Sequence, residues 1–180
     1  MASERSSILY RIPARALRRR PLLEFARRLE NDVAGGRAFD CLITDDGELR
    51  RLNSQFRGSD SATDVLSFAA ASHGQLGEIA ISFDRAREQA SDFGHSVDEE
   101  VRVLMLHGVL HLMGMDHERD HGEMRRIELR WRRRLGLPSG LIERVDSRPP
   151  INAASPHVRI ERVDTRRQSR SSRNLRPVTP

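Results

Sequence analysis

The eleven residues 107–117, with the sequence HGVLHLMGMDH, constrain the fold more than any other segment. Histidines stand at offsets 0, 4 and 10 of this segment, and a glycine stands at offset 7. The mostly apolar residues 101–106 precede it and follow three acidic residues, an order typical of a helix whose N-terminus attracts negative charge. On such a helix His107 and His111 share one face, about 6 Å apart along the axis at ~1.5 Å per residue.

A glycine and a third histidine follow the predicted helix. Gly114 is expected to end the helix, because glycine tolerates the left-handed conformation found at helix C-termini. The chain then turns back and can return His117 toward His107 and His111. Three imidazoles, each with a Zn–N distance of about 2.0–2.1 Å, leave one position of a tetrahedral zinc ion open, as in catalytic zinc sites. A lone histidine on an apolar helix is more often a packed core residue, but three at this spacing favour a metal site.

The same offsets occur in the metzincin peptidases, whose motif is H-E-x-x-H-x-x-G-x-x-H. The second residue of that motif is a glutamate that serves as general base, whereas this chain has Gly108, which cannot take a proton. The chain is therefore predicted to have a zincin-like metal-binding helix without the peptidase base. This argues against proteolysis but keeps the Lewis-acid chemistry of the ion, which can polarise a phosphoryl oxygen or lower the pKa of bound water.

Length and composition predict one domain followed by a tail. The chain has 180 residues, and its N-terminus lacks a signal-peptide pattern. No run of about eighteen apolar residues occurs, so we expect no membrane span and a cytoplasmic protein. The only cysteine, Cys41, lies in an apolar segment and is expected to be a buried thiol. All 31 basic residues are arginine, and this composition alone does not indicate a function.

Positive charge is concentrated in residues 147–180. This segment has eight arginines against Glu161 and Asp164, a net charge of +6, while the whole chain carries +5. It is rich in serine, proline and arginine and poor in large apolar residues, which predicts a disordered tail after a domain at residues 1–146. A basic tail suits RNA, because binding releases the counterions of the phosphates. A solvated extension without a function is an equally good interpretation.

The body of the chain predicts an α+β fold in which a small mixed sheet packs with helices. Short apolar or alternating runs predict strands, and apolar residues three or four apart predict helices. The expected strands are residues 8–12, 38–44, 65–68 and 79–83. The expected helices are residues 21–33, a helix from a capping box at 45–48 through 56, residues 84–90, the histidine helix, and 120–135.

A second polar segment spans residues 53–68, with the sequence NSQFRGSDSATDVLSF. Arg57 is expected at a helix end, before a polar loop and a strand. An arginine in this place can grip a phosphate bidentately, which lysine cannot do. From spacing alone, an ion pair of Arg57 with Asp60 or Asp64 is the better interpretation.

Three segments, taken in order, resemble the YbeY family of bacterial zinc-dependent endoribonucleases, also called rRNA maturation factors. They are the N-x-x-F-R-x-x-D-x-x-T-D-V-L-S-F pattern at 53–68, LGEIAIS at 76–82 and HGVLHLMGMDH at 107–117. The resemblance covers roughly residues 5–137. The chain departs from the family pattern by Met115 in place of a common aromatic residue, Ala69 in place of a proline and Glu78 in place of an aspartate. None of these departures removes a ligand.

The resemblance implies a compact domain in which a small sheet packs against helices, with the metal at the mouth of a cleft. It implies that His107, His111 and His117 hold one zinc ion, and that Arg57 lies in the same cleft and contributes to activity by holding a phosphate. It also implies a single-strand-specific endoribonuclease that acts on the 16S rRNA precursor. The implied roles are 3′-end maturation and ribosome quality control, with ribosomal or assembly proteins as further partners.

The sequence leaves the mechanism open. The nucleophile is either a zinc-activated water or the RNA 2′-hydroxyl, and no general base is assigned. Asp116 and Glu118 flank His117, where orientation of a histidine or plain solvation is a simpler role for them. The alternative functions are a metallopeptidase and a non-catalytic ribosome-assembly protein whose zinc only stabilises the fold. Four further histidines match no ligand position and are expected at the surface or in loops: His73, His95, His121 and His157.

Overall fold

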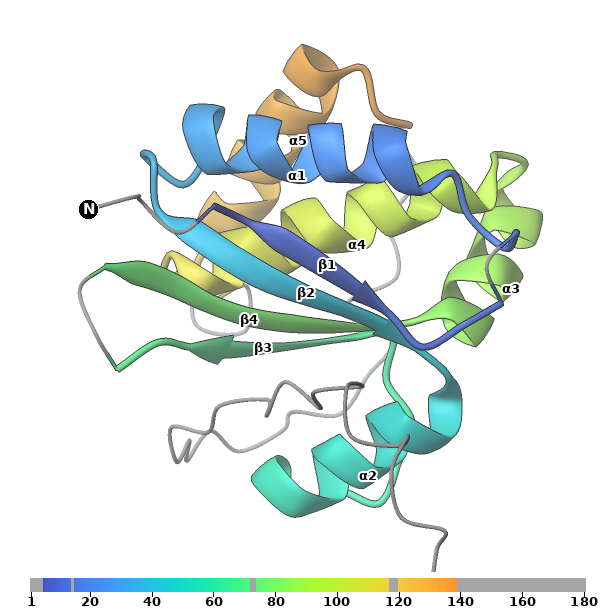
Figure 1. The fold of residues 1–180 in the computed structure, drawn as a ribbon. Helices are drawn as coiled ribbons and strands as arrows, with labels where there is room; N and C mark the ends of the chain where they lie inside the picture. Colours follow the sequence, from blue (N-terminus) through green and yellow to red (C-terminus); the bar gives the residue numbers. More distant parts are fainter. Residues whose placement is uncertain (1–4, 14, 72–73, 117–119, 139–180) are drawn as a thin grey trace, which may run out of the picture.

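The computed structural model describes residues 5–13, 15–71, 74–116 and 120–138 (Figure 1). Within these ranges a four-stranded sheet packs with five helices, which confirms the predicted α+β class. The strands are β1 (Ser7–Tyr10), β2 (Ala38–Thr44), β3 (Val65–Ala69) and β4 (Gln75–Ser82). The helices are α1 (Arg19–Asp32), α2 (Asp46–Arg57), α3 (Phe83–Phe93), α4 (Val97–Leu112) and α5 (Glu123–Leu135).

The sheet has the strand order β1-β2-β4-β3 and is mixed, as predicted. β1, β2 and β4 run parallel, whereas β3 pairs antiparallel with β4 at the edge of the sheet. The register places Cys41 of β2 beside Ile8 of β1 and Ile79 of β4. α1 connects β1 to β2, because parallel neighbours cannot be joined by a tight turn.

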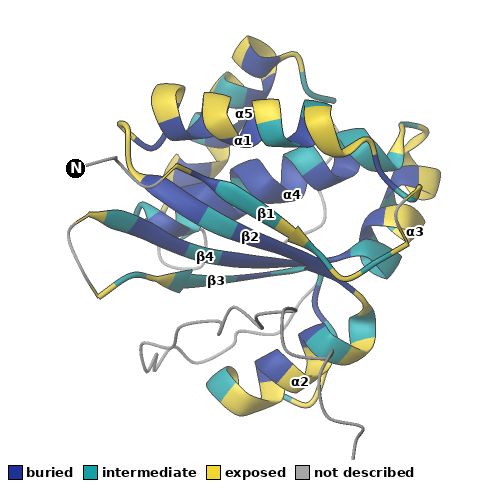
Figure 2. Ribbon diagram, in the orientation of Figure 1, coloured by how far each residue is buried: buried dark blue, intermediate teal, exposed yellow. Residues whose placement is uncertain are grey.

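The larger hydrophobic core lies on the face of the sheet where α1, α4 and α5 are found (Figure 1). β2 turns Phe39, Cys41 and Ile43 toward this face, because side chains two apart on a strand point to the same side. The thiol of Cys41 is buried there as predicted, and burial raises its pKa. α4 is buried on nearly all sides and forms the centre of the helical layer (Figure 2).

A smaller core lies on the opposite face of the sheet, under α2. It joins Leu49 and Leu52 of α2 to Leu42, Leu66 and Ala80 of the sheet. α2 and α4 therefore cover opposite faces of the same strands (Figure 1).

The element boundaries differ from the prediction by a few residues. The first strand ends at Tyr10, the fourth begins at Gln75, and α3 continues to Phe93. α5 begins at Glu123 rather than at residue 120, because the side chain of Asp120 accepts hydrogen bonds from the first N–H groups of the helix. Asp120 therefore precedes the helix and closes its N-terminus.

Several predictions concern parts of the chain outside the described residues. These are the disordered tail at 147–180, the domain boundary at 146, the third ligand His117, its neighbour Glu118, and the two histidines His73 and His157. Among the described residues, no helix has the length and apolar character that a membrane span requires.

Candidate metal centre

α4 carries both predicted ligands that the structure describes. Its N-terminus is closed by a capping box, in which the Ser96 hydroxyl accepts from the Glu99 N–H and the Glu99 carboxylate accepts from the Ser96 N–H. The acidic residues of the first turn complement the helix dipole, as the sequence indicates. Burial among α1, α3, α5 and the sheet then holds the helix in place, so the core determines where its side chains point.

His107 and His111 lie one turn apart on α4 and face each other. Their ring centroids are 4.6 Å apart, and the ring planes are inclined by 76°. The two Nε2 atoms are 3.0 Å apart, so both can lie about 2.1 Å from a single zinc ion. The spacing of four residues thus brings the two imidazoles together as predicted, while the ion itself stays a prediction.

α4 ends at the glycine that the sequence indicates. Gly114 has a φ of 88°, and the Met115 N–H donates to the Leu110 carbonyl at 3.2 Å, a bond typical of helix C-termini. The chain reverses at this point. His117 follows outside the described residues, so the third ligand stays a prediction. Within the described ranges alone, no group of three metal-binding side chains is found.

A buried glutamate that the sequence analysis missed lies behind the histidines. The Oε2 atom of Glu128, on α5, is 3.0 Å from Nδ1 of His107, and its Oε1 atom accepts a hydrogen bond from Arg132. Glu128 is 5% exposed and Arg132 is 1% exposed. Burial raises the pKa of Glu128, but the hydrogen bonds and charges of His107 and Arg132 outweigh it and hold this pKa below its usual value.

The carboxylate of Glu128 determines which nitrogen of His107 carries the proton. A carboxylate can only accept hydrogen bonds, so Nδ1 of His107 must be the donor. In the neutral imidazole Nε2 is then unprotonated, and Nε2 is the atom that faces His111. Metal-bound histidines usually donate their other N–H to a carboxylate or carbonyl in this way. The side chains therefore fit a metal ion between the two rings.

Gly108 allows α4 to approach the sheet closely. A Cβ atom at this position would lie 2.9 and 3.0 Å from two carbons of Ile79 and 3.2 Å from the Ser67 hydroxyl. The same hydroxyl donates a hydrogen bond to the Gly108 carbonyl at 3.2 Å. A glutamate in the place of the peptidase base would therefore run into β3 and β4. The absence of that base in the sequence has a packing reason as well as a chemical consequence.

Arg57 is the last residue of α2, which Gly58 ends with a φ of 67°. Its side chain is exposed and forms no ion pair with any described residue. Asp60 pairs instead with Arg50, at 2.7 Å. The ion pair of Arg57 with Asp60 or Asp64, which spacing alone favoured, is therefore not observed among the residues that the structure describes.

The edge strand β3 separates Arg57 from the histidine pair. Phe56, beside Arg57, contacts Phe68 near the end of β3 with ring centroids 5.4 Å apart. α4 ends over the same part of the sheet, because Leu112 Cδ2 lies 2.9 Å from where a Cβ of Gly77 would stand. The C-terminal ends of α2 and α4 thus lie on opposite faces of the sheet, at the same end of the strands (Figure 1). Among the described residues Arg57 makes no direct contact with the histidine pair, so the cleft that they are expected to share stays a prediction.

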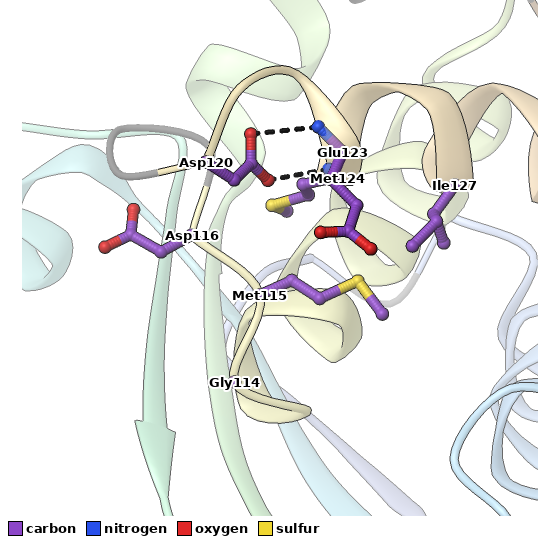
Figure 3. Close-up of a pocket in the computed structure, with 7 residues that line it drawn as sticks. All are labelled: Gly114, Met115, Asp116, Asp120, Glu123, Met124 and Ile127. Atoms are coloured by element: carbon purple, nitrogen blue, oxygen red, sulfur yellow. Dashed lines mark hydrogen bonds between the residues drawn. The ribbon is translucent and has the colours of Figure 1, made fainter.

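A cavity of about 450 Å³ opens beside the end of α4 (Figure 3). Apolar and acidic side chains share its walls, and the lining residues are Gly114, Met115, Asp116, Asp120, Glu123, Met124 and Ile127. The carboxylate of Asp120 is held by the backbone N–H groups of Glu123 and Met124, at 3.1 and 2.7 Å (Figure 3). The cavity therefore has a fixed wall beside the end of α4.

Two of the remaining histidines lie within the described residues. His95 lies in the loop before α4, as expected, and is partly buried, with its Nε2 atom 2.6 Å from the carboxylate of Glu100. Its ring also stacks on Phe93, with centroids 6.4 Å apart. The carboxylate of Glu100, buried in the core, compensates for the partial burial of this imidazole. His121 is exposed, as expected.

Comparisons with known proteins relate most of the chain to one family. The family model described as "Endoribonuclease YbeY" matches residues 17–136. A Solibacter usitatus protein of that name is 58% identical over 144 residues, which are 80% of this chain and 97% of the relative. Another from Koribacter versatilis is 58% identical over 113 residues, 63% of this chain and 74% of the relative. The solution structure of TM1509 from Thermotoga maritima is 26% identical and covers 79% of this chain and 99% of its own, with a TM-score of 0.51.

Proposed function

The chain belongs to the YbeY family, and on this premise we propose that it is a metal-dependent endoribonuclease. The observation that carries the proposal is the histidine pair of α4. The Nε2 atoms of His107 and His111 converge at 3.0 Å, while Glu128 accepts the proton of the opposite nitrogen of His107. RNA as the substrate is supported by the relatives, which are endoribonucleases by name.

We propose that the ion is zinc, held by His107, His111 and His117. Imidazole nitrogens suit zinc, and three protein ligands leave one coordination position for water or substrate. When bound, the ion supplies a Lewis acid that polarises a phosphoryl oxygen or lowers the pKa of a bound water. The part of His117 rests on its spacing in the sequence and on the resemblance to the family.

Two residues of α5 orient His107, the first of these ligands. Glu128 fixes the tautomer and orientation of His107, and Arg132 holds the Glu128 carboxylate while offsetting its charge inside the core. These contacts hold the His107 imidazole in one orientation. A ligand that is already oriented loses less conformational freedom when the ion binds.

We assign Arg57 the role of binding a phosphate of the RNA. Its planar guanidinium offers paired donors that match phosphate oxygens, and it can offset charge that develops on the reacting phosphoryl group. The side chain is exposed and has no carboxylate partner among the described residues, so its donors are available to a ligand. An RNA strand that passes around the edge strand β3 would meet both Arg57 and the histidine pair.

The packing around Gly108 argues against a metallopeptidase. The space that a peptidase glutamate would need is filled by Ile79 and Ser67. The remaining alternative is a non-catalytic ribosome-assembly protein whose zinc only stabilises the fold. That alternative predicts that Arg57→Ala leaves function in the cell intact.

We further propose that the RNA substrate is single-stranded and belongs to the 16S rRNA precursor. The reaction would serve 3′-end maturation and ribosome quality control in the cytoplasm, with ribosomal or assembly proteins as partners. Support for this finer assignment comes from the resemblance of residues 53–68, 76–82 and 107–117 to the family. The +6 charge of residues 147–180 also suits a large RNA partner.

Cleavage of a defined 16S precursor by the zinc-loaded full chain tests the proposed function. Arg57→Ala is expected to keep the zinc content and the melting temperature but to lose cleavage. Arg50→Ala is the matched control, because Arg50 lies on the same helix and is paired with Asp60; it should keep cleavage. Unchanged cleavage by Arg57→Ala would remove Arg57 from the site, and an inactive zinc-loaded wild type would overturn the proposal.

The ends of the cleaved RNA identify the nucleophile. A 2′,3′-cyclic phosphate would show that the RNA 2′-hydroxyl attacks and would exclude water for the cutting step. A 3′-hydroxyl with a 5′-phosphate would show attack by water.

A further inference from the structure

Arginines follow the outer side of α5, the helix whose inner side touches the histidine site. Five of them are exposed, and we call this set the arginine face: Arg125, Arg126, Arg130, Arg133 and Arg134. The inner side of the same helix buries Met124, Glu128 and Leu135. The arginine face is thus the solvent side of an amphipathic helix, and nothing in the proposed function has used it.

The arginine face lacks counter-charges, unlike several exposed arginines of α1 and α2 that are ion-paired. Arg20 pairs with Glu24 at 3.0 Å, and Arg50 pairs with Asp60 at 2.7 Å. No member of the arginine face forms an ion pair with a carboxylate in the part of the chain that the structure describes. Like charges four apart destabilise a helix, and Arg126 and Arg130 have this spacing. An external anion would therefore relieve the repulsion within the face.

Helical spacing connects the arginine face to the cavity beside the end of α4. Ile127 lines that cavity, and Trp131 and Arg134 follow it four and seven residues later on the same side of the helix. The guanidinium of Arg134 lies over the Trp131 ring, 5.1 Å from its centroid. Glu128, next to Ile127, contacts His107. A ligand that lies along this side of α5 therefore leads toward the cavity beside the end of α4, the helix that carries the histidine pair.

The chemistry of the surface fits the backbone of a single nucleic-acid strand. Guanidinium groups bind phosphates through paired donors, and the binding gains free energy from released counterions. An aromatic ring among cationic groups is the second component of single-strand binding surfaces, because bases stack on it. Trp131 is partly buried at the edge of the arginine face and supplies such a ring.

We propose that the arginine face of α5 is a docking surface for the sugar–phosphate backbone of an RNA strand on its way to the histidine pair. The identity of the anion as RNA rests on the proposed function. The position of the surface rests on the exposure, the missing counter-charges and the spacing along α5.

Salt-dependent binding of a labelled single-stranded RNA to the full chain tests this proposal. The variant Arg126→Gln/Arg130→Gln/Arg133→Gln removes three charges of the face, and glutamine keeps the helix propensity of arginine. Each phosphate contact contributes about 0.7 to the slope of log affinity against log salt for single strands, so the slope should fall by about 2. The affinity lost between 50 and 200 mM salt should shrink by about twentyfold as a result.

A matched control separates the effect of this surface from the effect of net charge alone. Arg20→Gln/Arg50→Gln/Arg51→Gln removes the same charge from ion-paired arginines on α1 and α2 and should leave the slope unchanged. The proposal is overturned if the α5 variant binds with the wild-type slope, or if both triple variants lose slope equally. Electrophoresis of the RNA after each titration confirms that its length is unchanged.

Two further measurements distinguish this inference from the proposed function. The chain has one tryptophan, so quenching of Trp131 fluorescence by RNA reports contact at α5 directly. In cleavage assays, loss of docking should raise KM and leave kcat close to the wild-type value. RNA that quenches Trp131 but is never cut would overturn the proposed function and keep the docking surface. Cleavage with a wild-type KM in the α5 variant would overturn only the docking surface.

Discussion

Near each end of α4 a partly buried histidine lies against a buried glutamate, but only at one end does a second imidazole lie close by. At the start of the helix, Nε2 of His95 lies 2.6 Å from Glu100. Toward the end, Nδ1 of His107 lies 3.0 Å from Glu128. The first pair uses Nε2, the ring nitrogen farther from the backbone. The second pair uses Nδ1, the ring nitrogen nearer the backbone, and leaves Nε2 directed at His111.

This contrast shows that a histidine paired with a buried glutamate is not in itself evidence of a metal site. His95 is closed in by Glu100 and by stacking on Phe93, so the pair is explained by the stability of the core. At the other end of α4, a second imidazole one turn away gives the pair a further use. We therefore expect Glu100 to act on stability, and Glu128 to act on the orientation of a ligand.

Removal of an imidazole should give the largest difference between the two ends of α4. His111→Ala is expected to lose stoichiometric zinc and all cleavage, because two imidazoles can no longer converge on one ion. Some stability should be lost with the metal, since its binding energy is also folding energy. His95→Ala should keep the zinc and show only a lower melting temperature. Zinc analysis of both purified variants checks this, and a zinc-loaded His111→Ala would contradict it.

Neutralising the two glutamates should give the next largest difference between the two ends of α4. Glu128→Gln should weaken zinc about 10- to 100-fold, the usual effect of losing the carboxylate behind a metal-bound histidine. Glu100→Gln should leave the zinc affinity unchanged, although it removes a buried partner of the same type. Competition with a chelator of known affinity measures both values. Equal zinc affinities for the two variants would show that Glu128 is only a core residue.

A methyl group at Gly108 should affect folding more than chemistry. Gly108→Ala is expected to lower the free energy of unfolding by about 1–3 kcal/mol, because the new Cβ meets Ile79 and Ser67 at 2.9–3.2 Å. Gly47→Ala is the control in α2, where the one close atom is the Asp45 carboxylate at 3.3 Å; it should change stability by less than about 1 kcal/mol. Urea unfolding of both variants measures these changes in stability. A wild-type midpoint for Gly108→Ala would refute the packing argument.

Loss of the capping box should give the smallest effect, confined to the start of α4. Ser96→Ala removes the acceptor for the Glu99 N–H and should lower stability by about 1 kcal/mol. Zinc content and RNA cleavage should stay at the wild-type level, because the histidine pair lies at the other end of the helix. A change in zinc affinity on this substitution would mean that the two ends of α4 are coupled.

The parts of the site that depend on local geometry could be predicted from the sequence. Helical periodicity fixes the side on which His107 and His111 lie, and Gly114 ends the helix because of its own backbone freedom. Glu128 could not be predicted, since its contact with His107 depends on how α5 packs against α4. A signal was present nonetheless: Glu128 and Arg132 lie four apart on the otherwise apolar side of the helix.

Two other residues show where the sequence was insufficient. Spacing favoured an ion pair for Arg57, but Asp60 meets Arg50, which lies two turns earlier on the same helix. The choice between these arginines depends on the path of the loop after α2. For Gly108, the comparison with peptidases identified the missing base. The reason why no side chain fits there lies in β3 and β4, which are distant in sequence.

The central claim, that zinc at the end of α4 enables RNA cleavage, is tested most directly by removing the ion and restoring it. The full chain is stripped with a chelator, and cleavage of a 16S precursor is measured as zinc is added back. We predict that cleavage disappears with the zinc, returns in proportion to the zinc bound by the wild type, and does not return in His111→Ala. Cleavage at the wild-type rate without zinc, or by zinc-free His111→Ala, would contradict the claim.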